Sequence, residues 1–347
     1  MSSNISGTQK AELSRLRELS ARIGGDPMLT QASTGNTSIK LGGTLWIKAS
    51  GKWLVNARGE DTLIPLDLDD VRECMEHSAD PAEIYAGASI ETAMHAVLPH
   101  PVVLHVHSVN TIAWAVRQDA THQLTRKLDG LRWRWVPYVS SGLPLAQAIE
   151  RVLSKSAEAD VLVLGNHGLV IGGEDCAKVE DVLSQVEERL AVLPRPAGEI
   201  DSPALKQIAQ GSPWDLPSDD VVHALATDTV SQAILSRGIL YPCQSIFSDS
   251  NEPEIFRAIP CLDSKDLYEN RYSTRPFLLI NGKGVMVRRT MTSSQLAMLS
   301  GLARVVQRID SSAPIHYLSD QEVAYSARTI SSRYQQRDPQ SQYSVAP

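Results

Sequence analysis

The chain has 347 residues, of which 42% are hydrophobic and 21% are charged. This composition is typical of a soluble globular protein, and the length is sufficient for a large core and two domains. The formal net charge is −7 at pH 7. It argues against a nucleic-acid-binding protein, because such proteins usually present a strongly basic face.

The cysteines and the apolar segments indicate a compartment. No C-x-x-C pair occurs, so we expect reduced thiols rather than a disulfide framework. The N-terminal segment lacks the apolar stretch of a secretory signal. No apolar run approaches the roughly 20 residues of a membrane span. We therefore expect a cytoplasmic protein with no membrane partner; its four cysteines are Cys74, Cys176, Cys243 and Cys261.

The first hundred residues predict a helix, a hairpin and a second helix. Leucines and an isoleucine at helical spacing predict an amphipathic helix that ends at residues 24–27. Strands at 36–41 and 44–49 are joined by Gly42-Gly43, a hairpin signal. Residues 65–71 read as an acidic turn. Residues 81–98 read as a loop and then a helix that carries Glu91 and His95.

The next hundred residues alternate between strands and helices. Residues 102–108 predict a short strand, and 110–118 and 145–156 predict helices. Residues 160–173 read as strand, tight turn and strand. A long helix follows over 176–193, with its apolar side chains on one face.

Prolines mark the expected domain boundary. Five of them fall between residues 194 and 217, which predicts a linker over 196–219. We expect a catalytic domain over 1–195, a smaller α/β domain over 220–335, and a loose tail over 336–347. The smaller domain echoes the end of the first one in a strand–turn–strand–helix pattern. A degenerate repeat explains this echo about as well as chance or a common supersecondary unit does.

Three histidines and one glutamate form the candidate metal site. Residues i and i+2 of a strand share a face, so His105 and His107 point the same way. His167 lies in a turn between two apolar strands, where its side chain can project toward a pocket. Glu91 comes just before the strand of His105. Three imidazoles and a carboxylate suit zinc or another divalent transition metal.

The other histidines have simpler interpretations. A His-x-His pair alone occurs without metal, so the pattern by itself leaves a structural role open. His95, four residues after Glu91, is expected to pack or to hydrogen-bond on its helix. His100 belongs to a proline turn. The isolated histidines are expected at the surface or in structural roles: His122, His223 and His316.

Six motifs occur in one order and together resemble the class II aldolase and adducin family. The pattern is most similar to the aldolase portion of rhamnulose-phosphate aldolase/alcohol dehydrogenase fusions, although no G-x-G-x-x-G follows a predicted strand. The resemblance covers residues 10–195 well and continues more weakly to about residue 335. The motifs are GNTSIK (35–40), IKASGKWL (47–54), SIETAMH (89–95), LHVHS (104–108), VPYVSSGLPLA (136–146) and GNHGLVIGG (165–173).

The resemblance implies a fold and an assembly. The fold is a three-layer α/β/α arrangement around a mainly antiparallel sheet, with a smaller α/β segment after it. The assembly is a ring-like homotetramer with active sites at subunit interfaces. Tyr138 does not match the tyrosine that a neighbouring subunit contributes in some members, and core packing is its expected role.

The resemblance also implies roles for single residues. His105, His107 and His167 match zinc ligands, and Glu91 matches a residue that both binds the metal and acts as general acid/base. A phosphate pocket is implied by Asn36, Ser50, Gly51 and Ser89, with Ile90 in place of a second serine. Lys48 is positioned to add positive charge there, although a solvated strand edge is an equal interpretation.

The implied activity is a zinc-dependent aldolase of carbohydrate metabolism. It would cleave or form a carbon–carbon bond in a ketose, or a ketose 1-phosphate, through a metal-stabilised enediolate. Epimerases, dehydratases and decarboxylases of the same family are alternatives, but 4-epimerases usually carry aspartate at the position of Glu91. A non-catalytic adducin-like interaction module is a second alternative, and it would lack the metal ligands.

Overall fold

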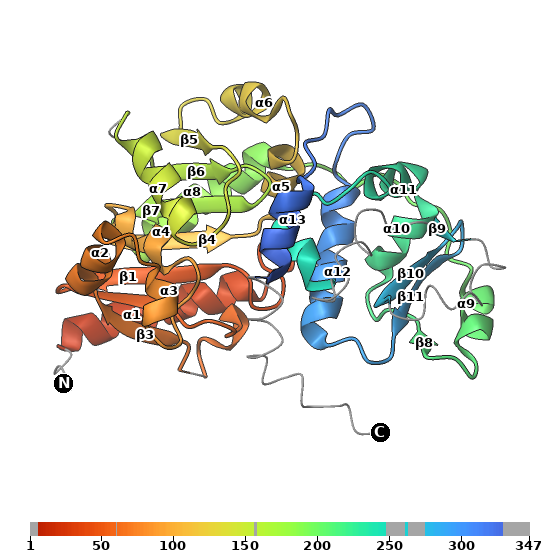
Figure 1. The fold of residues 1–347 in the computed structure, drawn as a ribbon, viewed down its shortest axis with the longest axis horizontal. Coiled ribbons are helices and arrows are strands. Elements are labelled where there is room, and N and C mark those ends of the chain that lie inside the picture. The colour runs from red at the N-terminus through yellow and green to blue at the C-terminus, as the bar shows by residue number, and fades with distance from the viewer. Residues whose placement is uncertain (1–5, 60, 156–157, 248–260, 263–274, 329–347) are drawn as a thin grey trace. The chain divides into compact units, whose positions relative to one another are not determined.

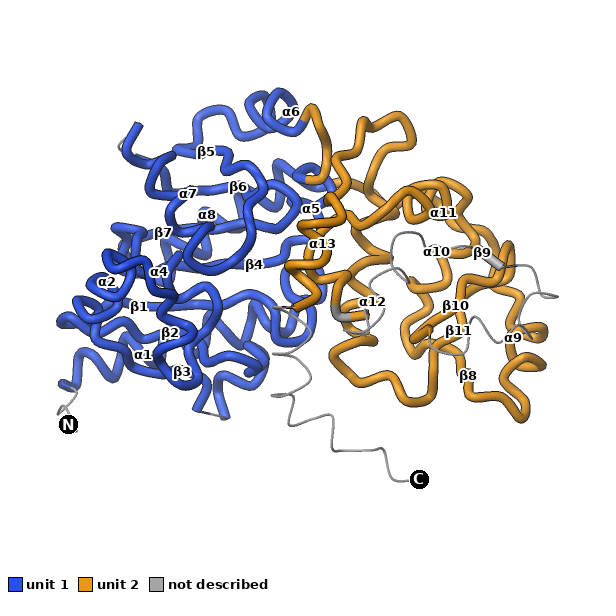
Figure 2. The backbone as a smooth tube through the Cα atoms, viewed as in Figure 1, with its two compact units in different colours: residues 1–115, 120–191 blue, residues 116–119, 192–347 orange. Residues whose placement is uncertain are grey.

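The computed structural model describes residues 6–59, 61–155, 158–247, 261–262 and 275–328. The chain divides into two compact units (Figure 2). Unit 1 contains residues 1–115 and 120–191, and unit 2 contains residues 116–119 and 192–347. The candidate site lies entirely in unit 1.

A seven-stranded sheet forms the centre of unit 1 (Figure 1). Its spatial order is β3-β2-β1-β4-β7-β6-β5, and only the pair β5–β6 is parallel. This confirms the predicted mainly antiparallel sheet and the predicted hairpin. The strands are β1 (Asn36–Leu41), β2 (Thr44–Lys48), β3 (Leu63–Asp67), β4 (Val102–Val106), β5 (Trp133–Val136), β6 (Val161–Leu164) and β7 (Gly168–Gly173).

Helices cover both faces of this sheet. On one face α1 and α8 pack on Leu104 and Val106 of β4, and on the other face α4 and α7 pack on Val103. Successive side chains of β4 point to opposite faces, and because the strand is a near-continuous apolar run it can be buried on both sides. The helices of unit 1 are α1 (Gly7–Gly24), η1 (Leu54–Asn56), α2 (Leu68–Glu76), α3 (Pro81–Ile84), α4 (Thr92–Val97), α5 (Val109–Ala115), α6 (Ala120–Lys127), α7 (Leu143–Leu153) and α8 (Cys176–Leu190).

Two local predictions for unit 1 were wrong. The expected acidic turn at 65–71 is the end of β3 and the start of α2, because the Asp67 side chain accepts from the main-chain N–H groups of Asp69 and Asp70 and caps that helix. Glu91 does not lie within a helix: it is the N-cap residue that precedes α4, with φ −100° and ψ 12°. Its side chain is therefore placed by a turn.

Unit 2 contains a second, smaller sheet in the order β8-β11-β10-β9. Its hairpin β10–β11 is followed by α12, the same order as β6, β7 and α8 in unit 1. The elements are α9 (Ser202–Ala209), β8 (Trp214–Asp215), η2 (Asp220–His223), α10 (Ala224–Thr227), α11 (Thr229–Leu235), η3 (Pro242–Phe247), β9 (Cys261–Leu262), β10 (Phe277–Ile280), β11 (Gly284–Arg288), α12 (Ser293–Val306) and α13 (Asp320–Ser326).

Four further predictions concern the linker, the tail, membrane spans and disulfides. The proline-rich segment 196–219 contains α9 and β8, so it is not simply an extended connection. The predicted tail at 336–347 falls outside the described residues. Within the described part of the chain, no helix combines the length and apolar character that crossing a bilayer requires. No disulfide joins Cys74, Cys176 or Cys243.

Candidate metal centre

The candidate site lies where β4 ends and β7 begins. β4 pairs with β1 on one side and with β7 on the other, and in this register Asn36 lies opposite His105. His107 follows the last residue of β4, and His167 immediately precedes β7. Paired residues of antiparallel strands share a face, so the sheet itself gathers side chains from three strands at one spot.

The three predicted histidines come together as a buried cluster. The ring centroids lie 5.0 Å apart for His105–His107, 5.0 Å for His105–His167 and 5.1 Å for His107–His167. One ligand nitrogen from each ring lies within 4.8 Å of the others. The rings are at most 5% exposed. This nearly equilateral arrangement presents three imidazoles to a common centre.

The separations between donor atoms fit a metal ion. His105 Nε2 lies 3.1 Å from His107 Nε2. Two nitrogens bound tetrahedrally to one zinc ion at about 2.0–2.1 Å would lie about 3.3–3.4 Å apart. His105 also donates from Nδ1 to the Leu169 carbonyl over 3.0 Å, which leaves Nε2 as the acceptor nitrogen. An outer hydrogen bond of this kind is usual behind a metal-bound histidine.

The carboxylate of Glu91 lies against two of the three histidines. Its Oε1 lies 3.3 Å from His105 Nε2 and 3.2 Å from His167 Nε2. Burial alone would raise the pKa of the Glu91 carboxyl, but its proximity to the imidazoles of His105 and His167 outweighs burial and holds that pKa well below its usual range. The carboxylate is therefore ionised, and a cation at the centre would favour the same state.

Two of the imidazoles, His107 and His167, are held in the form that binds metal. Burial lowers the pKa of His107 well below its usual range, and the neighbouring His105 and His167 lower it further. Burial also lowers the pKa of His167, although its hydrogen bond to Glu91 opposes the shift. A neutral imidazole keeps a lone pair for coordination.

The turn that carries His167 requires close approach to β4. A Cβ atom at Gly168 would lie 2.5 Å from the carbonyl oxygen of Val106. Asn166 has φ 50°, a left-handed conformation that asparagine tolerates better than most residues. The sequence Asn-His-Gly thus lets the chain reverse tightly while His167 stays against His105.

Two of the four predicted phosphate-pocket residues lie beside Glu91. Asn36 donates from Nδ2 to Glu91 Oε2 over 2.7 Å and to Ser89 Oγ over 3.3 Å. Ser89 Oγ also accepts from the main-chain N–H of Glu91 over 3.2 Å. The structure thus links these two residues to the carboxylate.

The other two residues, Ser50 and Gly51, follow β2. The Ser50 main-chain N–H donates to Gly87 over 2.9 Å, and Gly51 has φ 77°. Among the described residues, no hydrogen bond joins either of them to Glu91 or the histidines.

Lys48 is buried rather than at a solvated edge. It is 3% exposed and donates from Nζ to the carbonyls of Ser33 (2.7 Å) and Lys52 (2.8 Å). Burial lowers its pKa to about 8, and the charge of Glu91 partly opposes this shift. The lysine therefore ties the Ser50–Gly51 turn to residue 33 and brings positive potential toward the site.

The sequence did not assign His95 or Ser38 to the site. His95 was expected to bond within its own helix, but its ring instead bonds to Ser38 and Asn36 of β1. Burial lowers the pKa of His95 to about 3. Asn36 and Ser38 alternate along β1 and so share the face of His105. This two-residue spacing is the sequence signal that could have placed Ser38 beside the site.

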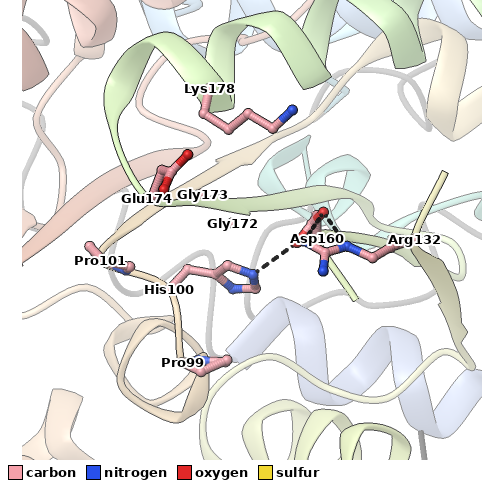
Figure 3. Close-up of a pocket in the computed structure, with 9 residues that line it drawn as sticks. All are labelled: Pro99, His100, Pro101, Arg132, Asp160, Gly172, Gly173, Glu174 and Lys178. Atoms are coloured by element: carbon pink, nitrogen blue, oxygen red, sulfur yellow. Dashed lines mark hydrogen bonds and ion pairs between the residues drawn. The ribbon is translucent and has the colours of Figure 1, made fainter. Parts of the chain in front are cut away.

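A separate hollow lies beside the start of β4 and the end of β7, whereas the histidine cluster lies at the other ends of these two strands. It has a volume of about 300 Å³, and His100, Arg132 and Asp160 are among the residues that line it (Figure 3). His100 and Arg132 both bond to Asp160. The charged groups that line the hollow thus largely neutralise one another. None of the residues that line it belongs to the histidine cluster.

Comparisons with known proteins identify the family of the chain. The sequence profile of the Class II Aldolase and Adducin N-terminal domain matches residues 15–193. An uncharacterized oxidoreductase, YuxG, from Bacillus subtilis (strain 168) is 29% identical over 174 residues, covering 44% of this chain and 25% of that protein. The chain thus spans about a quarter of the length of this curated relative.

Solved structures give two further similarities. The N-terminal class II aldolase domain of a conserved protein from Thermoplasma acidophilum is 24% identical, with a TM-score of 0.43, over 55% of this chain and 93% of that one. L-fuculose-1-phosphate aldolase from Thermus thermophilus is 18% identical, with a TM-score of 0.39, over 52% and 91%. Because the domain profile spans more than half of the sequence, the chain belongs to the class II aldolase and adducin family.

Proposed function

We propose that the chain is a metal-dependent aldolase that cleaves or forms a carbon–carbon bond in a ketose 1-phosphate, with zinc as the metal. One observation carries the proposal: the two oxygens of Glu91 face different partners. Oε1 faces His105 and His167, and Oε2 accepts from Asn36. A carboxylate between a metal-binding cluster and a fixed hydrogen-bond donor is well placed to move protons.

In the proposed reaction, the histidines would bind the metal and Glu91 would transfer protons. His105, His107 and His167 would hold the ion, which when bound supplies a Lewis acid for the negative charge that develops on the substrate oxygens. Glu91 would take the proton from the substrate hydroxyl as the adjacent carbon–carbon bond breaks. It would return a proton to the carbon left with the electron pair. Three histidines leave coordination positions for substrate, as a catalytic site requires.

The phosphate would bind on the side of Glu91 away from the histidines. Asn36 and Ser89 already lie against the carboxylate, and Ser50 and Gly51 form a turn whose N–H groups can approach an anion. The buried Lys48 supports this assignment, since its positive charge lies behind the same turn. Ile90 leaves one fewer hydroxyl for the phosphate than a serine would.

We also propose the oligomer that the family resemblance implies, a ring-like homotetramer acting in the cytoplasm. Sedimentation at micromolar concentration should give four chains per particle. A monomer at that concentration would contradict the proposed assembly.

A substrate screen tests the activity. The zinc-loaded protein should condense dihydroxyacetone phosphate with at least one small aldehyde, and it should cleave the resulting ketose phosphate. The metal-stripped protein and the Glu91→Gln variant are the controls. Decarboxylation or epimerisation without any condensation would replace aldol cleavage by another activity of the family. A metal-free protein without turnover would favour the interaction module.

A further inference from the structure

A line of hydrogen bonds runs behind Glu91, away from the histidine cluster. Ser38 Oγ lies 2.7 Å from His95 Nδ1. The other ring nitrogen, Nε2, bonds to Asn36 Oδ1. Asn36 Nδ2 in turn lies 2.7 Å from Glu91 Oε2. The four side chains thus form one continuous path from β1 through α4, back to β1, and on to the carboxylate.

The bonds made by Asn36 fix the direction of every bond in this path. Asn36 donates from Nδ2 to Glu91 Oε2 and to Ser89 Oγ, two oxygens that can accept from it. Asn36 Oδ1 must then face His95 and accept from Nε2–H. The opposite nitrogen, Nδ1, is therefore an acceptor, and the Ser38 hydroxyl donates to it. Each donor points toward Glu91, and His95 is held as the Nε2–H tautomer.

Water cannot substitute for a member of the path. Ser38 and His95 are 0% exposed, Asn36 is 3% exposed and Glu91 is 5% exposed. Loss of the His95 donor would leave Asn36 Oδ1 buried without that bond. The Asn36 amide would then be held only through Nδ2, by Glu91 Oε2 and Ser89 Oγ, and could withdraw from the carboxylate to regain a partner for its oxygen.

We propose that His95 is a positioning residue for Glu91 and acts through Asn36. The imidazole fixes the Asn36 amide so that Nδ2 holds Glu91 Oε2, which keeps Oε1 toward His105 and His167. The inference rests on the proposed function for its effect on turnover. It also makes a claim about metal binding that needs no substrate.

Three variants separate positioning from packing. His95→Phe keeps a ring but removes both nitrogens. His95→Gln replaces Nε2–H by an amide donor at a similar distance from the main chain. Met94→Ala is the matched control: Met94 lies on the same helix, is 0% exposed, and packs in a cluster of apolar side chains. It should lower stability without touching the path.

Titration of the metal-free proteins with Co²⁺ gives the main measurement, through its visible absorption and the dissociation constant. His95→Phe should weaken Co²⁺ binding by about 10–100-fold, as loss of outer-shell partners does, and should change the absorption spectrum. His95→Gln should recover most of the affinity and the spectrum. Met94→Ala should lower the melting temperature and leave both at wild-type values.

A double-variant cycle tests the route through Asn36. If His95 acts through Asn36, then His95→Phe should weaken Co²⁺ binding no further in an Asn36→Ala background. Additive losses would overturn the route. If aldol turnover is found, His95→Phe should lower kcat with little change in KM, and His95→Gln should restore it.

The proposal fails if His95→Phe binds Co²⁺ with wild-type affinity and spectrum while its melting temperature falls like that of Met94→Ala. If His95→Phe does not fold, His95→Met takes its place, because its flexible apolar side chain fills irregular space. The same outcomes then decide. Absence of aldol turnover in the wild-type protein would reject the proposed function but would leave the Co²⁺ result intact.

Discussion

His105 donates a hydrogen bond from Nδ1 to the main-chain carbonyl of Leu169 over 3.0 Å. A carbonyl can only accept, so this bond selects the tautomer of the ring and turns Nε2 toward Glu91 and the other histidines. Leu169 lies on β7, one strand away from β4. The neighbouring strand therefore orients the ligand that β4 carries, and metal binding depends on how these two strands meet.

Removal of one histidine should lower metal occupancy. We expect roughly one divalent ion per chain in the purified protein, held by three imidazoles. His167→Ala removes one bond and leaves two, so occupancy after dialysis against a weak chelator should fall markedly. Elemental analysis measures this, with His122→Ala, an exposed histidine, as the control. Full metal content in His167→Ala would remove His167 from the ligand set.

Glu91→Gln should separate binding from turnover. The amide keeps the size of the side chain but is not basic. Turnover should fall by about 10²–10⁴, the range that lost general acid/base catalysis produces. Substrate affinity should change much less, because the loss falls on the transition state. Metal content, melting temperature and kcat should be measured on one preparation. A stable, zinc-loaded variant with wild-type kcat would end the catalytic assignment.

Gly168→Ala should distort the site by displacing the main chain that carries its histidines. The new methyl group would lie 2.5 Å from the Val106 carbonyl oxygen and 3.3 Å from His105 Cε1. Either β4 or the His167 turn must shift, at a stability cost of about 1–3 kcal/mol. We expect lower Co²⁺ affinity and a lower melting temperature together. Gly59→Ala, which meets no atom within 4 Å, is the control. Wild-type Co²⁺ binding by Gly168→Ala would show that the close contact is dispensable.

Unit 2 should lose stability in mild acid through His223. Its Nδ1 accepts from the main-chain N–H of Val285 over 3.0 Å, and burial lowers its pKa, with the charge of Asp220 partly opposing. Below about pH 6.5 the unfolded chain takes up a proton that folded His223 resists. Unfolding free energy therefore falls as the pH falls.

His223→Asn tests this, because Asn can accept at a similar position but does not titrate. Urea unfolding between pH 5 and 7 should show a shallower dependence for the variant, by at most about 1.4 kcal/mol per pH unit. His122→Asn should keep the wild-type dependence. Equal slopes in all three proteins would mean that His223 does not contribute.

The sequence predicted the helices and strands whose signal lies within a short stretch of the chain. The hairpin β1–β2 followed from Gly42-Gly43. The strands β4, β6 and β7 followed from short apolar runs, and α8 followed from its apolar periodicity. β3 was missed because it is short, lies at the sheet edge and contains Pro65, which is tolerated there. Only its pairing with β2 identifies it as a strand.

The spacing of residues in the sequence predicted the group of three histidines but not every residue around it. The alternation of His105 and His107, and the turn at His167, pointed to a shared centre. The role of His95 was not visible, because its four-residue spacing from Glu91 suggested a bond along one helix. Glu91 instead precedes that helix, and the partners of His95 come from β1. Contacts between distant segments of this kind leave no periodic signal.

The central position of β4 also has a consequence for folding. The groups that meet at the site come from β1, from the turn before α4, from β4 and from the turn before β7, so they are far apart in sequence. Contacts of long sequence separation form late and slowly. An ion would therefore find its full set of ligands only after β7 has joined the sheet, and its capture would report completion of unit 1 during refolding.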